Sequence, residues 1–150
     1  MARRFVIDSS VVSKALYAND DRESVRELIE LAARKELILY APYLLWYECL
    51  SVISQMVHDE EMALDALSIL KSWIDSRTII ILPEPPGHWE QTLQTAMTIT
   101  TGFGYVSSYD ACFHMLALSE GCPFLTSDKK HYNKTKDSIG GILLFEDLEL

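Results

Sequence analysis

Short runs of β-type residues alternate along this chain with longer segments of helical periodicity. In residues 22–34, for example, Val25, Leu28, Ile29 and Ala32 recur at helical spacing. This alternation is typical of an α/β fold with a mainly parallel sheet. We expect strands at residues 4–7, 37–40, 78–82 and 123–126, with a fifth at 142–145, and helices at residues 9–16, 22–34, 42–58, 60–76, 89–100 and 107–120.

The length of 150 residues is usual for one domain, so we interpret residues 1–150 as a single domain. The proline-rich segment 83–87 reads as a loop inside that domain. Three cysteines, none in a C-x-x-C pair, indicate buried reduced thiols rather than a disulfide framework or a zinc site. No apolar stretch approaches the roughly 18 residues needed to cross a bilayer, and the first apolar run is too short for a signal peptide. We therefore expect a cytoplasmic protein without a membrane partner.

Three aspartates lie close to the ends of expected strands. Asp8 directly follows the first strand, Asp128 lies just past the fourth, and Asp110 lies in the first turn of the helix before the fourth. Because ligands of open parallel sheets bind outside the carboxyl ends of the strands, these acids are expected at one edge. Glu48 instead lies within a helix, where it borders an apolar stripe that includes Leu45. A carboxylate there is costly to desolvate unless it is paired or bound to a cation.

Each acid also has a simpler interpretation. Asp8 could cap a helix, Asp110 could complete a capping box with Ser107, and Asp128 could cap a turn or short helix. Glu48 could be half-exposed at the border of its stripe. The four together favour a shared site, because unrelated caps and a stray glutamate are not expected to converge on one edge of one sheet.

Clustered carboxylates repel one another unless some are protonated or a cation lies between them. Hard oxygen ligands suit Mg²⁺ or Mn²⁺. Such an ion can hold a phosphodiester, lower the pKa of a bound water and stabilise the leaving oxygen. This chemistry requires no nucleophilic side chain.

At these residues the sequence resembles the PIN domain, and within that family the VapC-type toxin ribonucleases of prokaryotic toxin–antitoxin systems. The matching segments are Phe5-Val6-Ile7-Asp8-Ser9-Ser10-Val11, Tyr47-Glu48-Cys49-Leu50-Ser51-Val52, Ser108-Tyr109-Asp110-Ala111-Cys112-Phe113 and Phe124-Leu125-Thr126-Ser127-Asp128. Each motif is short, but their order in an α/β chain of this length is fairly specific, and the resemblance spans nearly the whole chain.

The resemblance implies a three-layer α/β/α sandwich around a parallel sheet of four to five strands. It implies a metal-dependent endoribonuclease in which one or two Mg²⁺ or Mn²⁺ ions are held by four acids. Those acids are Asp8 and Asp110 as principal ligands, with Glu48 and Asp128. Ser10 and Thr126 would be supporting polar groups. Proteins of this kind are commonly homodimers, and a small antitoxin protein inhibits the toxins among them.

The formal net charge of −9 is unusual for a protein with an RNA substrate, since phosphate contacts normally come from Lys and Arg. A basic run that begins with Lys129 and Lys130 follows Asp128, and we interpret it either as an RNA contact that steers phosphate or as a solvated loop. The acidic surface also suits a basic antitoxin tail. The four histidines share no metal spacing, and the three tryptophans are expected to be packing residues.

Two other functions fit these residues as well as a toxin ribonuclease does, and a third fits them less well. A PIN protein can process RNA without an antitoxin, and a PIN module can act as a non-catalytic binding scaffold. A phosphatase of the haloacid-dehalogenase kind would need a second aspartate two positions after Asp8, where this chain has Ser10. The sequence therefore favours a PIN nuclease and leaves the toxin subclass and the scaffold alternative open.

Overall fold

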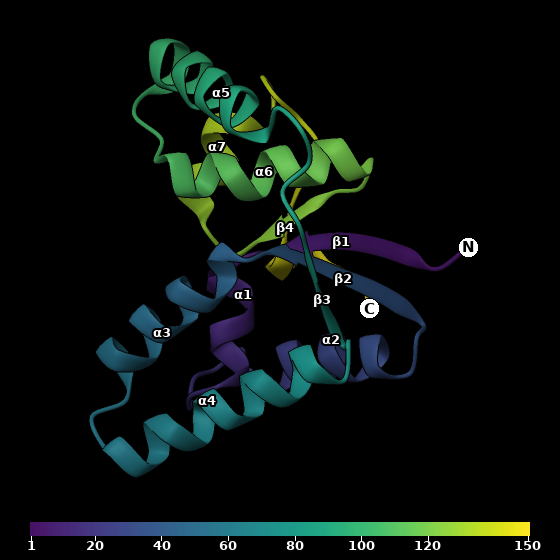
Figure 1. Cartoon of the computed structure of the whole chain (residues 1–150), viewed down its shortest axis with the longest axis vertical. Coiled ribbons are helices and arrows are strands. Elements are labelled where there is room, and N and C mark those ends of the chain that lie inside the picture. The colour runs from purple at the N-terminus through teal and green to yellow at the C-terminus, as the bar shows by residue number, and fades with distance from the viewer.

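A single five-stranded sheet, with every neighbouring strand pair parallel, runs through the computed structural model, which describes all 150 residues (Figure 1). The strand order is β3-β2-β1-β4-β5. The strands span Arg3–Ile7 (β1), Leu37–Pro42 (β2), Ile79–Leu82 (β3), Phe124–Thr126 (β4) and Ile142–Leu144 (β5). The five expected strands are therefore all present, and the sheet is wholly rather than mainly parallel.

Seven α-helices cover the two faces of this sheet. They span Ser9–Val12 (α1), Arg22–Ala33 (α2), Leu44–Met56 (α3), Glu60–Asp75 (α4), His88–Phe103 (α5), Ser108–Glu120 (α6) and Lys129–Thr135 (α7), and two short 3-10 turns span Ser13–Ala15 and Phe145–Asp147. Helices α1 to α4 lie on one face, while α6 and α7, with α5 packed on α6, lie on the other (Figure 1). This arrangement confirms the predicted α/β/α sandwich.

The core fills both spaces between the sheet and its helices. On one face, Phe113 of α6 stacks on Phe124 of β4 with ring centroids 6.2 Å apart. On the other face, Leu28 of α2 is buried, as are Val25, Ile29 and Ala32, which the helical pattern had placed on the same side. The sheet is covered on both faces, which explains why its strands are nearly continuous apolar runs rather than alternating ones.

The strand order creates a switch point between β1 and β4. From the central strand β1 the chain builds β2 and β3 outward on one side, and it then returns to build β4 and β5 on the other. The connections that leave the carboxyl ends of β1 and β4 therefore diverge to opposite faces of the sheet. Such a divergence opens a crevice at the strand ends, which is where open parallel sheets bind their ligands. Asp8 and Asp128 both lie at this point.

Two local expectations were wrong. Pro42 ends β2 instead of opening a helix, and α3 begins at Leu44. The solvated-loop interpretation of the basic run after Asp128 was wrong, because residues 129–135 form α7, the kind of short helix that Asp128 was expected to be able to cap. This helix buries His131 and Thr135, one turn apart, so it lacks the apolar periodicity by which the sequence indicates a helix.

The aromatic and sulfur-containing residues follow expectation with one exception. Trp46 and Trp73 are partly buried and pack against the main core, as predicted. Trp89, however, is 70% exposed at the start of α5, so its predicted packing role was wrong. All three cysteines are buried and free, which confirms the prediction of reduced thiols. None of the helices combines the length and the apolar character that a membrane span requires.

Candidate metal centre

Asp8 is the most enclosed of the four acids, with only 6% of its surface exposed. It caps α1, because its Oδ1 accepts from the Ser10 amide at 3.1 Å and from the Ser10 hydroxyl at 2.5 Å. Its Oδ2 accepts from the Thr126 hydroxyl, across the switch point, at 2.7 Å. The predicted supporting groups Ser10 and Thr126 thus both contact Asp8, and their hydroxyl oxygens lie 3.1 Å apart. Asp8 therefore both caps α1 and belongs to the group of four acids.

Glu48 is half-buried on α3 and faces the same crevice through Ser9, whose hydroxyl donates to Glu48 Oε2 at 3.0 Å. Ser9 was not predicted to belong to the site. Its adjacency to Asp8 in the Asp-Ser-Ser segment was a signal that could have found it. The contact spans 39 positions, so it depends on how α3 packs against α1 rather than on either local sequence.

Ser107 caps α6 and pairs with Asp110, as the sequence indicated, but Asp110 does not accept from the backbone amide of Ser107 as it would in a full capping box. The Ser107 hydroxyl donates to Asp110 Oδ2 at 2.9 Å, and the backbone amide of Asp110 donates to the oxygen of the same hydroxyl at 3.2 Å. Asp110 Oδ1 has no hydrogen-bond partner. The nearby cation of Lys134, on α7, favours the charged form of Asp110.

Asp128 caps α7, where its Oδ1 accepts from the amides of Lys130 and His131 at 2.8 and 3.1 Å. Its own amide donates to the Thr126 hydroxyl at 3.0 Å, which links it to Asp8 through one residue. Asp128 Oδ2 is left without a hydrogen bond. The side chains of Lys129 and Lys130 are exposed beside this acid.

Burial and mutual repulsion weaken the acidity of three of these groups. Desolvation raises the pKa of Asp8 to about 6, with a smaller contribution from the charge of Asp110. Desolvation also raises the pKa of Glu48 to about 7, and the charges of Asp8 and Asp110 add to it. The pKa of Asp110 is raised by desolvation and by the charge of Asp128. Each acid is thus within electrostatic reach of at least one other, as expected of a cluster of carboxylates.

The four acids repel one another, yet no three His, Cys, Asp or Glu side chains lie close enough together to form a ready-made metal site. Hydroxyl groups donate to three of the carboxylates, namely those of Ser10 and Thr126 to Asp8, Ser9 to Glu48 and Ser107 to Asp110. The donor set still fits a hard divalent cation, because it offers only oxygen and leaves unpartnered atoms on Asp110 and Asp128.

The PIN domain family model matches residues 5–137, most of the chain, so this protein belongs to the PIN domain family. No curated protein sequence matches it significantly.

Several solved structures share its fold. PAE2754 from Pyrobaculum aerophilum superposes with a TM-score of 0.67 at 20% identity, covering 97% of this chain and 86% of its own. DNA-bound VapBC from Salmonella typhimurium gives a TM-score of 0.69 at 16% identity, covering 97% and 99%. VapC20 from Mycobacterium tuberculosis, described as a Sarcin-Ricin loop cleaving toxin, gives 0.62 at 13% identity, covering 86% and 93%. At such identities the likeness concerns the fold.

Proposed function

We propose that this protein is a Mg²⁺- or Mn²⁺-dependent endoribonuclease and the toxin of a toxin–antitoxin pair. One observation carries the nuclease proposal: acids from four separate chain segments gather at the switch point of a PIN fold, where burial and repulsion raise the pKa of Asp8, Glu48 and Asp110. A divalent cation would relieve that repulsion. The VapBC and VapC20 neighbours, described as a toxin–antitoxin complex and a cleaving toxin, support the choice of subclass.

In this proposal Asp8, Glu48, Asp110 and Asp128 hold the ion, which when bound supplies Lewis-acid activation of water and stabilises charge on the leaving oxygen. Ser10 and Thr126 orient Asp8 by donating to its two oxygens. Ser9 does the same for Glu48. Lys129 and Lys130, exposed at the start of α7, attract the phosphates of the RNA chain toward the acids.

A second candidate function is a non-catalytic PIN module that binds a partner without cutting RNA. The observation that favours it is that the carboxylates do not form a ready-made metal site. A third reading keeps the nuclease and drops the antitoxin, since four acids alone do not distinguish a toxin from an RNA-processing enzyme. A homodimer is also proposed, by analogy with the family.

The deciding experiment is cleavage of a labelled structured RNA by the purified protein with Mn²⁺, with EDTA, and by an Asp8→Asn variant. We expect metal-dependent cleavage that falls by roughly a hundredfold or more in the variant, because an interaction with the ion is lost. Asp65→Asn, which removes an equal charge from an exposed position of α4, should cut like the wild type.

Equal cleavage by Asp8→Asn and the wild type would mean that the activity belongs to another nuclease. If calorimetry with Mn²⁺ detects no binding to the wild type at all, the scaffold function replaces the nuclease. Co-purification with the product of a neighbouring small reading frame, and loss of cleavage in that complex, would establish the toxin subclass.

A further inference from the structure

Two exposed tyrosines directly precede two of the site acids in the sequence. Tyr47 comes before Glu48 on α3, and Tyr109 comes before Asp110 at the start of α6. Successive residues of an α-helix point about 100° apart, so each ring lies beside its acid and not on top of it. The two acids are half-buried, whereas Tyr47 is 63% exposed and Tyr109 is 60% exposed. Each of these helices therefore places a free ring next to an acid.

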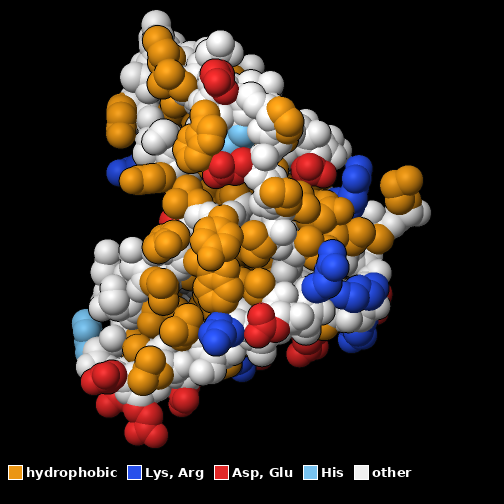
Figure 2. Space-filling model, in the orientation of Figure 1, with side chains coloured by type: hydrophobic (Ala, Val, Ile, Leu, Met, Phe, Trp, Pro, Cys, Tyr) orange, Lys and Arg blue, Asp and Glu red, His pale blue; other side chains and the backbone are white.

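Neither ring is part of the core. The two tyrosines belong neither to the buried clusters nor to the side chains packed against them. Tyr43, one turn before Tyr47, contacts it ring to ring, with centroids 6.5 Å apart and planes tilted by 56°. This contact restricts the Tyr47 ring and leaves its exposed surface free. Apolar side chains also gather across the middle of one face of the molecule, with acidic side chains among them (Figure 2). Exposed apolar groups on this scale indicate a binding surface.

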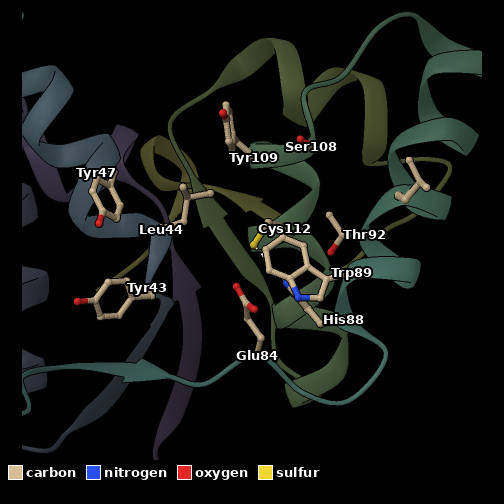
Figure 3. Close-up of a pocket in the computed structure, with 11 residues that line it drawn as sticks. Tyr43, Leu44, Tyr47, Glu84, His88, Trp89, Thr92, Ser108, Tyr109 and Cys112 are labelled. Carbon is tan, nitrogen blue, oxygen red and sulfur yellow. Dashed lines mark hydrogen bonds between the residues drawn. The ribbon is translucent and has the colours of Figure 1, made fainter.

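Both rings line the crevice that contains Glu48. This crevice has a volume of about 510 Å³, and it also includes Leu44 and Ser9, the residue whose hydroxyl donates to Glu48. Tyr47 projects from α3 and Tyr109 from α6, with Leu44 between them in the view of Figure 3. A chain held at the acids would therefore pass both rings.

Positive charge lies on the α6 side of this crevice. Lys134 of α7 donates to the backbone carbonyl of Tyr105, in the segment that leads into α6, and its charge acts on Asp110. Lys129 and Lys130 are exposed in the first turn of the same helix. Lysines attract a chain of phosphates, and free rings beside them bind unpaired bases, because every base has a π-face. The combination favours single-stranded nucleic acid over a protein segment.

We propose that Tyr47 and Tyr109 stack on the two unpaired bases that flank the phosphodiester held by the acids, in a single-stranded segment of RNA. The inference rests on the proposed function and deepens it, because it makes the two tyrosines the residues that position the strand for cutting. Stacking tolerates any base, so these positions need a base but show little preference among the four. Bases within a duplex are not free to stack on the rings, so paired segments are cut poorly.

The test is a double-mutant cycle between ring and base. It measures kcat/KM, with Mn²⁺, for a short single-stranded RNA and for two copies that lack the base on one side or the other of the cut. Tyr47→Ala and Tyr109→Ala should each lower kcat/KM for the complete RNA roughly tenfold. Each variant should lose most of its effect on one of the two abasic RNAs, because the ring that it removes then has no base to contact.

Three controls separate stacking from other roles of these residues. Trp89→Ala removes a ring that is 70% exposed but does not line the crevice with Glu48, so it should stay within about twofold of the wild type. Tyr47→Phe and Tyr109→Phe keep the ring and should recover most of the activity lost in the alanine variants. Calorimetry should give the alanine variants the Mn²⁺ affinity of the wild type, which shows that the adjacent acids have not moved.

A second readout does not depend on cleavage. A fluorescent purine analogue replaces either flanking base, and the RNA is titrated with the Asp8→Asn protein, which we expect to bind RNA with little cutting. Stacking on a ring should quench the analogue. Addition of Tyr47→Ala or Tyr109→Ala to that protein should each abolish the quenching at one of the two positions.

Equal losses on the complete and the abasic RNAs, or a loss in Trp89→Ala as large as in the tyrosine variants, would overturn the inference while leaving the nuclease intact. Absence of Mn²⁺-dependent cleavage by the wild type would remove the nuclease; quenching that depends on the tyrosines would then keep the stacking role, and unchanged fluorescence would remove it too. If the alanine variants dissociate an oligomer in light scattering and still cut like the wild type, the rings serve contact with a second copy.

Discussion

Single hydroxyl groups govern how the acids of this PIN protein are held. Thr126 donates to Asp8, Ser9 donates to Glu48 and Ser107 donates to Asp110. These bonds lower the pKa of each acid, but burial outweighs them and the net shift is upward. The hydroxyl groups thus orient the carboxylates and favour their charged forms, whereas burial disfavours those forms. A bound cation would offset the cost of that burial.

Asp8 should therefore destabilise the metal-free protein at neutral pH. Its pKa rises from 3.8 to about 6 on folding, so the folded state binds more protons than the unfolded state between these values. Stability from this group is fully present below pH 4, and it is lost as the pH rises through 6. The cost at pH 8 is on the order of 3 kcal/mol.

Asp8→Asn removes the charge and keeps the α1 cap. In EDTA at pH 8 we expect the variant to melt about 6–12 °C above the wild type. At pH 4 the difference should shrink or vanish. Thermal melts followed by circular dichroism measure both. A variant that melts lower than the wild type at pH 8 would show that the hydrogen bonds of Asp8 outweigh its desolvation.

At the scale of elements, helix termini bring the acids to one edge. Asp8 and Asp128 cap α1 and α7, and Asp110 lies in the first turn of α6. The partial positive charge of a helix N-terminus favours a nearby carboxylate, which partly offsets the repulsion within the cluster. The same local chemistry that begins each helix therefore also assembles the candidate site.

The far end of α6 gives a test of backbone chemistry that does not involve the site. Gly121 ends the helix in the left-handed region, at φ +61°, with nothing near its missing Cβ. Gly121→Ala should cost about 1 kcal/mol from backbone strain alone. Gly102, inside α5, has open space around it and no positive φ, so Gly102→Ala should stabilise by about 0.5–1 kcal/mol.

Urea unfolding at pH 7 measures both glycine variants. The midpoint should fall for Gly121→Ala and rise for Gly102→Ala, with unchanged slopes. If both substitutions shift the urea midpoint in the same direction, the backbone conformation of at least one of these two glycines differs from the one given above.

At the scale of the whole molecule, the net charge of −9 predisposes the protein to bind cations. Binding to the folded state alone raises stability by mass action, so Mn²⁺ in excess should raise the melting temperature. Protons compete for the same oxygens, and the relevant pKa values are about 6 for Asp8 and about 7 for Glu48.

We therefore expect the Mn²⁺-induced rise in melting temperature to be large at pH 8 and to fall steeply by pH 5.5, where both acids are largely protonated. Ca²⁺ at the same concentration is a control for nonspecific charge screening. Differential scanning fluorimetry across this pH range makes the comparison. A rise that is independent of pH would place the ion elsewhere.

The sequence by itself determined the α/β class of the fold and which acids are candidates for the site. Helical periodicity, capping residues and β-branched runs act over a few positions, so they could be read without the fold, and the position of Asp8 and Asp128 at strand ends followed from them. The predicted pairing of Ser107 with Asp110 was present for the same reason, although both of its hydrogen bonds involve the Ser107 hydroxyl and the full capping box does not form.

Only the tertiary structure decided which side chains meet. The contact of Ser10 with Thr126 spans 116 positions, and that of Ser9 with Glu48 spans 39, so no local pattern encodes either. Helix α7 was missed because its buried residues are polar. The exposure of Trp89 depends on how α5 packs against α6. Burial is a property of the assembled chain, and it is the main cause of the raised pKa values of Asp8, Glu48 and Asp110.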